Sequence, residues 1–137
     1  MKRAWLFMLV VAALTLAACG GNGEAPAADG GDAVDVAAIG DPQAGEQIYN
    51  TGGASQVGCV TCHTLDGTDL VGPSLDRISE VAAERVPGMS AEDYLHESIV
   101  QPDAYLVEGY DDLMPKNYGE TLSEEDIDNV IAFLITQ

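Results

Sequence analysis

The chain has 137 residues, which is room for one folded domain. It contains 23 acidic and 5 basic residues, so its formal net charge at pH 7 is −18. This negative charge repels the phosphate backbone and excludes nucleic acid as a partner. The acidity can serve solubility or can steer the protein towards basic docking surfaces, and the sequence leaves both meanings open.

The N-terminus has the pattern of an export signal. Lys2 and Arg3 precede a run of small and apolar residues over positions 4–18. This run is short for a membrane helix, because a bilayer span needs about twenty apolar residues. We therefore expect residues 1–18 to be a cleaved signal peptide.

The signal ends in Leu16-Ala17-Ala18-Cys19, which resembles the lipobox of bacterial lipoproteins. In a lipobox, cleavage falls before the cysteine, and the thiol then receives a diacylglyceryl group. We therefore expect Cys19 to carry lipid and to anchor the exported protein on the outer face of the cytoplasmic membrane. The alternative is an ordinary cleavage site with an incidental cysteine.

Residues 19–40 have the composition of a flexible tether. After Cys19 they are almost entirely Gly, Ala, Asp and Val, without aromatic or basic residues. Such a segment buries too little apolar surface to become ordered. Twenty flexible residues have a root-mean-square reach of roughly 25 Å, so the following domain is expected to swing between partners at a membrane surface.

The folded domain is expected to span residues 41–137 and to be all-α, because four helices are predicted and no segment alternates as a strand does. The first helix follows Asp41-Pro42, an N-cap with proline at the first helical position. A weaker helix is predicted to begin near Ser74. Its apolar face would consist of Leu75, Ile78 and Ala82.

The other two helices have clear N-terminal signals. Ser90 and Asp93 occupy capping-box positions at the start of the third helix, which should end near Gln101 because a proline follows. Ser123 and Asp126 provide the same signal for the last helix. Its apolar face is predicted to consist of Ile127, Val130, Ile131 and Leu134.

The run Cys59-Val60-Thr61-Cys62-His63 is a C-x-x-C-H motif, the attachment signature of a c-type haem. Its two thiols add to the vinyl groups of one porphyrin, and its histidine ligates the iron. A structural zinc site would need two further ligands at suitable spacing, and a thioredoxin-like pair would need a β-α-β context. We therefore predict one covalent haem c, attached to Cys59 and Cys62, with His63 as an axial ligand.

Three residues outside the signal are candidates for the opposite axial position: Met89, His96 and Met114. Met89 is explained as a hydrophobic staple before the Ser90 helix, and a helical histidine such as His96 is more often a surface residue. Met114 lies beside a proline in an irregular segment of about twenty residues, and so long a loop is unusual unless it packs on something. We predict that Met114 is the second axial ligand; the alternative is an adaptable core filler.

In order and spacing, residues 41–137 resemble class I c-type cytochromes. The likeness rests on Gly45 and Tyr49 before the C-x-x-C-H motif, on Gly72-Pro73-Ser74-Leu75 and Met114-Pro115 after it, and on the C-terminal amphipathic helix. The segment 94–115 is similar to the cytochrome c domain of haem-copper oxidase subunit II and to monohaem subunits of other respiratory complexes.

The resemblance implies a small fold of about four short helices around one haem. It implies that the Pro73 carbonyl accepts the Nδ1 proton of His63, which orients the ring. It also implies that Gly45 lets the first helix cross close to the last, with Tyr49 against Val130 and Phe133. The haem carboxylates would need partners, and five candidates are left open: Arg77, Arg85, Tyr105, Tyr110 and Tyr118.

The implied function is one-electron transfer and not enzymatic catalysis. The expected partners are membrane-bound redox complexes, with a quinol-oxidising complex as donor and a terminal oxidase or photosynthetic reaction centre as acceptor. Two alternatives stay open: a fixed haem subunit of a larger redox complex, and a haem-based sensor or peroxidase-like enzyme with an open distal position.

Overall fold

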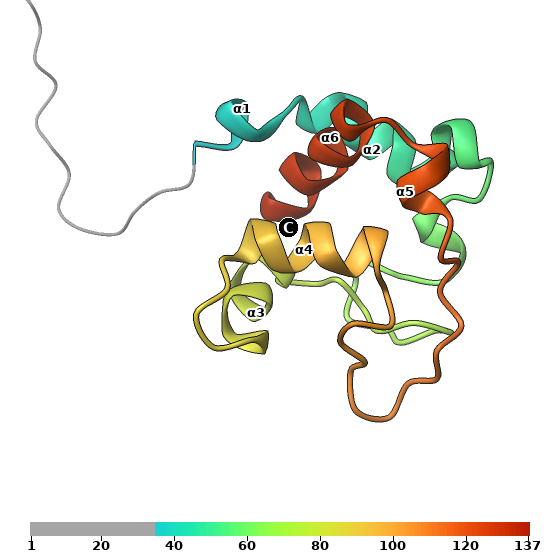
Figure 1. Ribbon diagram of the computed structural model, residues 1–137, viewed down its shortest axis with the longest axis vertical. Helices are drawn as coiled ribbons and strands as arrows, with labels where there is room; N and C mark the ends of the chain where they lie inside the picture. Colours follow the sequence, from blue (N-terminus) through green and yellow to red (C-terminus); the bar gives the residue numbers. More distant parts are fainter. Residues whose placement is uncertain (1–34) are drawn as a thin grey trace, which may run out of the picture. The chain divides into compact units, whose positions relative to one another are not determined.

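The computed structural model describes residues 35–137, and within this range the protein is all-α, as predicted, without a strand (Figure 1). The predicted signal peptide, Cys19 and most of the predicted tether lie outside the described residues. None of the helices in the described range is long and apolar enough to cross a membrane. The elements are α1 (Val36–Ile39), α2 (Pro42–Thr51), the 3₁₀ turns η1 (Gly53–Ser55) and η2 (Cys59–Thr61), α3 (Ile78–Arg85), α4 (Ala91–Val100), α5 (Tyr118–Thr121) and α6 (Glu124–Ile135).

Helices α2, α4 and α6 begin at the predicted caps. The Asp41 side chain accepts hydrogen bonds from two backbone N–H groups of the first turn of α2. The Ser90 hydroxyl accepts the backbone N–H of the third residue of α4 at 3.1 Å. Ser123 and Asp126 form a complete capping box at the start of α6. These local hydrogen bonds explain why the three helices begin where the sequence predicts.

Helix α3 begins at Ile78, so its predicted start near Ser74 was wrong. Ser74 takes part in a loop instead: its N–H donates to Asp69 Oδ1 at 3.0 Å, and its hydroxyl accepts the Gly67 N–H at 3.0 Å. Arg77, immediately before the helix, has a left-handed backbone with φ of 51°. The loop hydrogen bonds therefore delay the helix by one turn.

The predicted tether extended to Gly40, but the structure has the short helix α1 at Val36–Ile39. Ile39 packs against the hydrophobic core. A Cβ at Gly40 would lie 2.8 Å from backbone atoms of Asp128, so the chain already lies against α6 at this point. Ordered structure thus begins before Asp41, because this short segment packs on α6.

Helices α2 and α6 cross closely (Figure 1). A Cβ at Gly45 would lie 1.9 Å from the Asn129 carbonyl oxygen, so only glycine permits this approach. The Tyr49 and Phe133 rings pack with centroids 5.4 Å apart. The buried Asn129 side chain accepts the Asp41 N–H at 2.7 Å. The structure therefore contains the predicted close crossing of α2 and α6.

Candidate functional site

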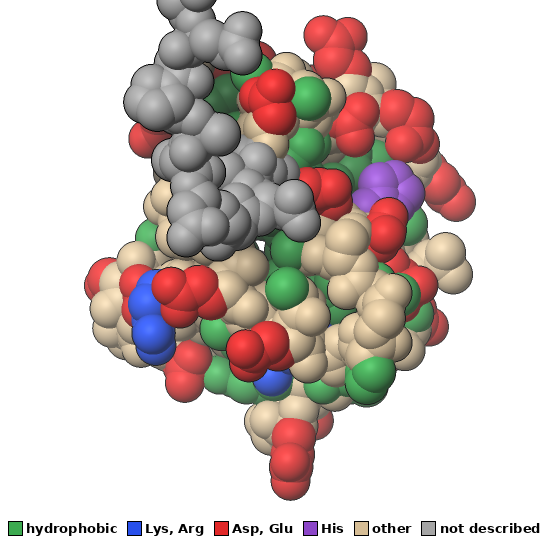
Figure 2. All heavy atoms as spheres, turned by 90° about the vertical axis from the view of Figure 1, so that its left-hand side faces the viewer, with side chains coloured by type: hydrophobic (Ala, Val, Ile, Leu, Met, Phe, Trp, Pro, Cys, Tyr) green, Lys and Arg blue, Asp and Glu red, His purple; other side chains and the backbone are tan. Residues whose placement is uncertain are grey.

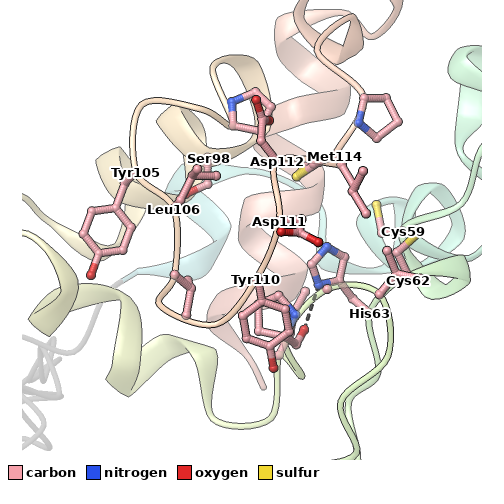
Figure 3. A pocket seen from close by; sticks show the side chains of 18 of the residues that line it. Cys59, Cys62, His63, Ser98, Tyr105, Leu106, Tyr110, Asp111, Asp112 and Met114 are labelled. Carbon is pink, nitrogen blue, oxygen red and sulfur yellow. Dashed lines mark hydrogen bonds between the residues drawn. The ribbon is translucent and has the colours of Figure 1, made fainter.

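A large cavity brings together the site residues that were predicted within the described range (Figure 3). Cys59, Cys62 and His63 line it from one segment, and Met114 lines it from a segment far along the chain. Its empty space, including the part open to solvent, is about 1020 Å³. Most of its exposed lining is apolar. Neither Met89 nor His96 lines this cavity.

The two cysteines are held by η2. The Cys62 and His63 N–H groups donate to the Cys59 carbonyl at 3.1 and 2.9 Å, which places the three side chains within one tight turn. The two thiols are not joined in a disulfide. Burial raises the pKa of the Cys59 thiol, so this group is neutral at ordinary pH.

The Pro73 carbonyl, ten residues later in the chain, orients the His63 ring. Its Nδ1 lies 2.7 Å from the Pro73 carbonyl oxygen, which is the contact that the resemblance implied. A carbonyl only accepts, so this hydrogen bond requires the proton on Nδ1 and leaves Nε2 with a free lone pair. A Cβ at Gly72 would lie 2.4 Å from Cε1, so the imidazole lies directly against glycine backbone. The ring is thereby prepared to bind a metal through Nε2.

Two buried tyrosines anchor the same segment. The Tyr49 hydroxyl of α2 donates to the His63 carbonyl at 2.8 Å, and the Tyr118 hydroxyl of α5 donates to the Val57 carbonyl at 3.1 Å. Burial raises the pKa of Tyr49 to about 12, so its hydroxyl remains a donor over the neutral range. Sequence reasoning missed both contacts, since Tyr118 was considered only as a partner for a haem carboxylate. No local pattern could have revealed them.

Lys116 closes the segment that carries Met114 into a loop. Its ammonium group lies 2.9 Å from Asp103 Oδ2 and 2.7 Å from Asp112 Oδ2, and hydrogen bonds to both carboxylates raise its pKa. Met114 is partly buried and packs against the core cluster. Most of the segment is irregular, as predicted, but its end forms α5, a single turn that the sequence analysis missed.

A family model described as cytochrome c oxidase, cbb3-type, subunit III matches residues 40–134. This is most of the chain and covers every residue of the site described above. The chain belongs to this family. It is a class I cytochrome c domain, hence an electron-transfer protein that binds haem c. No curated protein matches the chain.

The residues of this cytochrome fit a haem. The lining is mainly apolar, as a flat apolar macrocycle requires. Two thiols, a histidine with its Nε2 lone pair free and a thioether are the donor set of a c-type haem with His/Met ligation. The backbone of Gly72 leaves room beside the imidazole that any side chain would fill. The individual roles of these residues stay predictions.

Serine variants of the cysteines test the covalent attachment. We expect Cys59→Ser and Cys62→Ser each to keep haem through the remaining thioether, and the double variant to lose essentially all covalent haem. The measurement is haem staining after denaturing electrophoresis. Val60→Ala lies within the same motif and should stain like the wild type. Persistent staining of the double variant would contradict the prediction.

The structure also narrows the candidates for the haem carboxylates. Arg77 does not line the cavity; it pairs on the surface with Asp76 and Glu80. The other four candidates line it: Arg85, Tyr105, Tyr110 and Tyr118. Of these, Tyr118 already donates its hydroxyl proton to the backbone.

Proposed function

We propose that this protein is a monohaem c-type cytochrome, tethered to a membrane, that carries single electrons between respiratory or photosynthetic complexes. The proposal rests on the position of the His63 ring. Its Nδ1 is hydrogen-bonded to the Pro73 carbonyl, and the ring lines the cavity that Met114 also lines. This pair of side chains suits a six-coordinate electron carrier.

In this proposal, Cys59 and Cys62 would hold one haem covalently, and His63 and Met114 would ligate its iron. The haem supplies a one-electron couple. The Met114 thioether is a soft ligand and favours reduced iron, so it raises the potential relative to bis-histidine ligation. With both side chains in place, no position is open for oxygen or peroxide.

The surrounding residues hold this arrangement in place. The Pro73 carbonyl orients the His63 ring, and the hydrogen bond from Tyr49 to the His63 backbone fixes the segment. The apolar lining disfavours the additional positive charge of the oxidised state. Each of these effects supports rapid one-electron exchange without rearrangement of the protein.

Carbon monoxide binding distinguishes the carrier from a sensor or peroxidase-like enzyme. A reduced protein with both axial positions occupied should bind carbon monoxide very slowly or not at all. The measurement is the change in the visible spectrum after mixing the reduced protein with carbon monoxide. Rapid and complete binding would refute the six-coordinate carrier and favour the open-site alternative.

The surface around the cavity is suited to a basic partner. All the large apolar side chains that are exposed in the described range lie in its lining or next to it: Val57, Val60, Leu70, Val71, Tyr105, Leu106 and Leu113. Acidic side chains are spread over the face shown in Figure 2, and basic ones are few there. An apolar rim within an acidic surface supports docking to a redox complex whose own centre has basic surroundings.

The family match to an oxidase subunit supports a second candidate, a fixed haem subunit of a membrane redox complex. Extraction in mild detergent separates the two. A shuttle should be released as a monomer, and a quinol-oxidising complex should reduce it at a rate that falls steeply with salt. Stoichiometric co-purification with an oxidase would favour the fixed subunit.

We further propose that Cys19 carries the lipid anchor and that the protein resides on the outer face of the cytoplasmic membrane. Support comes from the lipobox pattern alone. Cys19→Ala should abolish the incorporation of labelled fatty acid into the haem-loaded protein, because the Cys19 thiol is where the lipid is attached. Equal labelling of the variant and the wild type would contradict this prediction.

A further inference from the structure

Arg85 presents an unsatisfied buried donor. It is the last residue of α3, and its side chain lines the cavity. Its Nε atom is buried and has no hydrogen-bond partner among residues 35–137. A guanidinium group stays charged at ordinary pH and has donors only. Leaving such a donor unpaired is costly, and more so for a charged group, so the cavity needs an acceptor at this point.

No carboxylate within the described range lies within 4.0 Å of Arg85, since every ion pair found there involves another cation. Two acids of this region have other partners: Asp112 pairs with Lys116, and Asp69 accepts the Ser74 N–H. The described residues thus offer Arg85 Nε no acceptor, and a bound ligand can provide one.

The lining of the cavity restricts the chemistry of that ligand. Among the lysines and arginines of residues 35–137, Arg85 alone lines the cavity, and most of the exposed lining is apolar. The ligand must accordingly be apolar over most of its surface and anionic at one edge. A haem has this distribution, because its macrocycle is apolar and its two carboxylates lie on the same side.

We propose that Arg85 binds a haem carboxylate. The inference rests on the haem site proposed above. It selects this residue from the five candidates that the sequence left open.

The position of Tyr110 supports this assignment. Tyr110 lines the cavity from the loop that carries Met114 (Figure 3). A hydrogen bond to the Asp69 carboxylate raises the pKa of the Tyr110 hydroxyl, and the positive charge of Arg85 acts in the opposite direction, so both groups lie near this hydroxyl. Asp69 belongs to the loop that carries Pro73. Arg85 therefore lies near residues of both loops, the one that carries Pro73 and the one that carries Met114.

The pairing has a consequence for the redox couple. An ionised carboxylate favours oxidised iron, and a guanidinium beside it offsets this effect and keeps the carboxylate ionised. Without the guanidinium, the potential should fall at alkaline pH. Protonation of the carboxylate would then raise the potential again as the pH falls, so the potential would become pH-dependent. The other charged groups to consider are Asp111 and Asp112, which line the cavity, and Asp69, which lies near Tyr110.

The test is a redox titration of the full haem-loaded protein between pH 5 and pH 9, with Arg85→Gln, Arg85→Lys and Arg77→Gln. We expect Arg85→Gln to have a lower potential at pH 8 and a redox-linked ionisation shifted upward by about one pH unit or more. A protonated carboxylic acid band should appear in its redox-difference infrared spectrum. Arg85→Lys should largely restore both properties, and the surface variant Arg77→Gln should match the wild type.

An Arg85→Gln protein with bound haem, an intact sulfur-to-iron band and wild-type pH dependence would overturn the inference. If Arg85→Gln yields no haem-loaded protein, Arg85→Lys and Arg85→Met decide the matter. Recovery with lysine alone supports a charge contact, whereas equal recovery with methionine, or failure of both, overturns it. Absence of covalent haem from the wild type would instead refute the proposed function itself.

Discussion

Replacing Met114 with alanine should abolish the near-infrared sulfur-to-iron band of the ferric protein and lower its reduction potential. The thioether favours reduced iron, and its loss leaves water or a weaker ligand in that position. Axial ligands set haem potentials over roughly 0.8 V, so the shift should exceed any effect of a surface charge. Near-infrared absorption and spectroelectrochemistry measure the two effects.

The same variant should gain rapid carbon monoxide binding in the reduced state, because one axial position becomes available. Unfolding would also open this position, so the comparison requires a variant whose helical circular dichroism matches that of the wild type. A Met114→Ala protein that keeps the band and excludes carbon monoxide would show that another residue holds this position.

Met89→Ala is the matched control. Met89 packs against the core before α4, and it does not line the cavity. Its truncation should lower the free energy of unfolding by about 1–2 kcal/mol, less than the usual cost for a fully buried methionine, and should leave the band in place. Loss of the band in Met89→Ala and its survival in Met114→Ala would reverse the assignment.

The helix starts that the sequence predicted well depend on local hydrogen bonds. Asp41, Ser90 and Ser123 each cap a helix through backbone N–H groups two or three residues away. Ser74 has the same chemical character, but its hydrogen bonds go to Asp69 and to other residues of the loop. The same residue type can cap a helix or hold a loop, and the outcome depends on the tertiary position of the segment.

The ordering of α1 could not be predicted for a related reason. An Ala- and Gly-rich segment has little apolar surface of its own, and its composition favours disorder. Ile39 and Gly40 nevertheless lie against the core and against α6, which follows almost ninety residues later in the sequence. Only the folded arrangement of α6 provides the surface on which this segment packs.

The sequence likewise predicted only part of the candidate site. The C-x-x-C-H motif and the Met114-Pro115 pair identified residues that do line one cavity. The hydrogen bonds that support these residues were harder to predict. The resemblance implied the one between His63 and Pro73, but those of the Tyr49 and Tyr118 hydroxyl groups were not foreseen. Tyr118 reaches a carbonyl that lies 61 positions away in the sequence. Such contacts depend on how the helices pack, so no short pattern encodes them.

Gly45→Ala should destabilise the protein although alanine is the better helix former. In an isolated helix this exchange stabilises by about 1 kcal/mol. In the protein, the new Cβ would lie 1.9 Å from the Asn129 carbonyl oxygen and 2.8 Å from Phe133 Cβ. Backbone cannot yield as a flexible side chain does, so α2 and α6 must separate. We expect a loss of about 3 kcal/mol in the free energy of unfolding, at the upper end for an overpacked core.

Denaturant titration of the haem-loaded protein measures this loss, and Gly119→Ala in α5 is the control. Its Cβ would meet the Val100 side chain at 3.3 Å, where a small shift relieves the contact. Separation of α2 from α6 would also displace Tyr49, which packs on Phe133 and donates to the His63 carbonyl. Gly45→Ala should therefore change the potential as well as the stability, whereas Gly119→Ala should change neither strongly. Unchanged stability of Gly45→Ala would mean that the crossing adapts and that α2 does not hold the His63 segment rigidly.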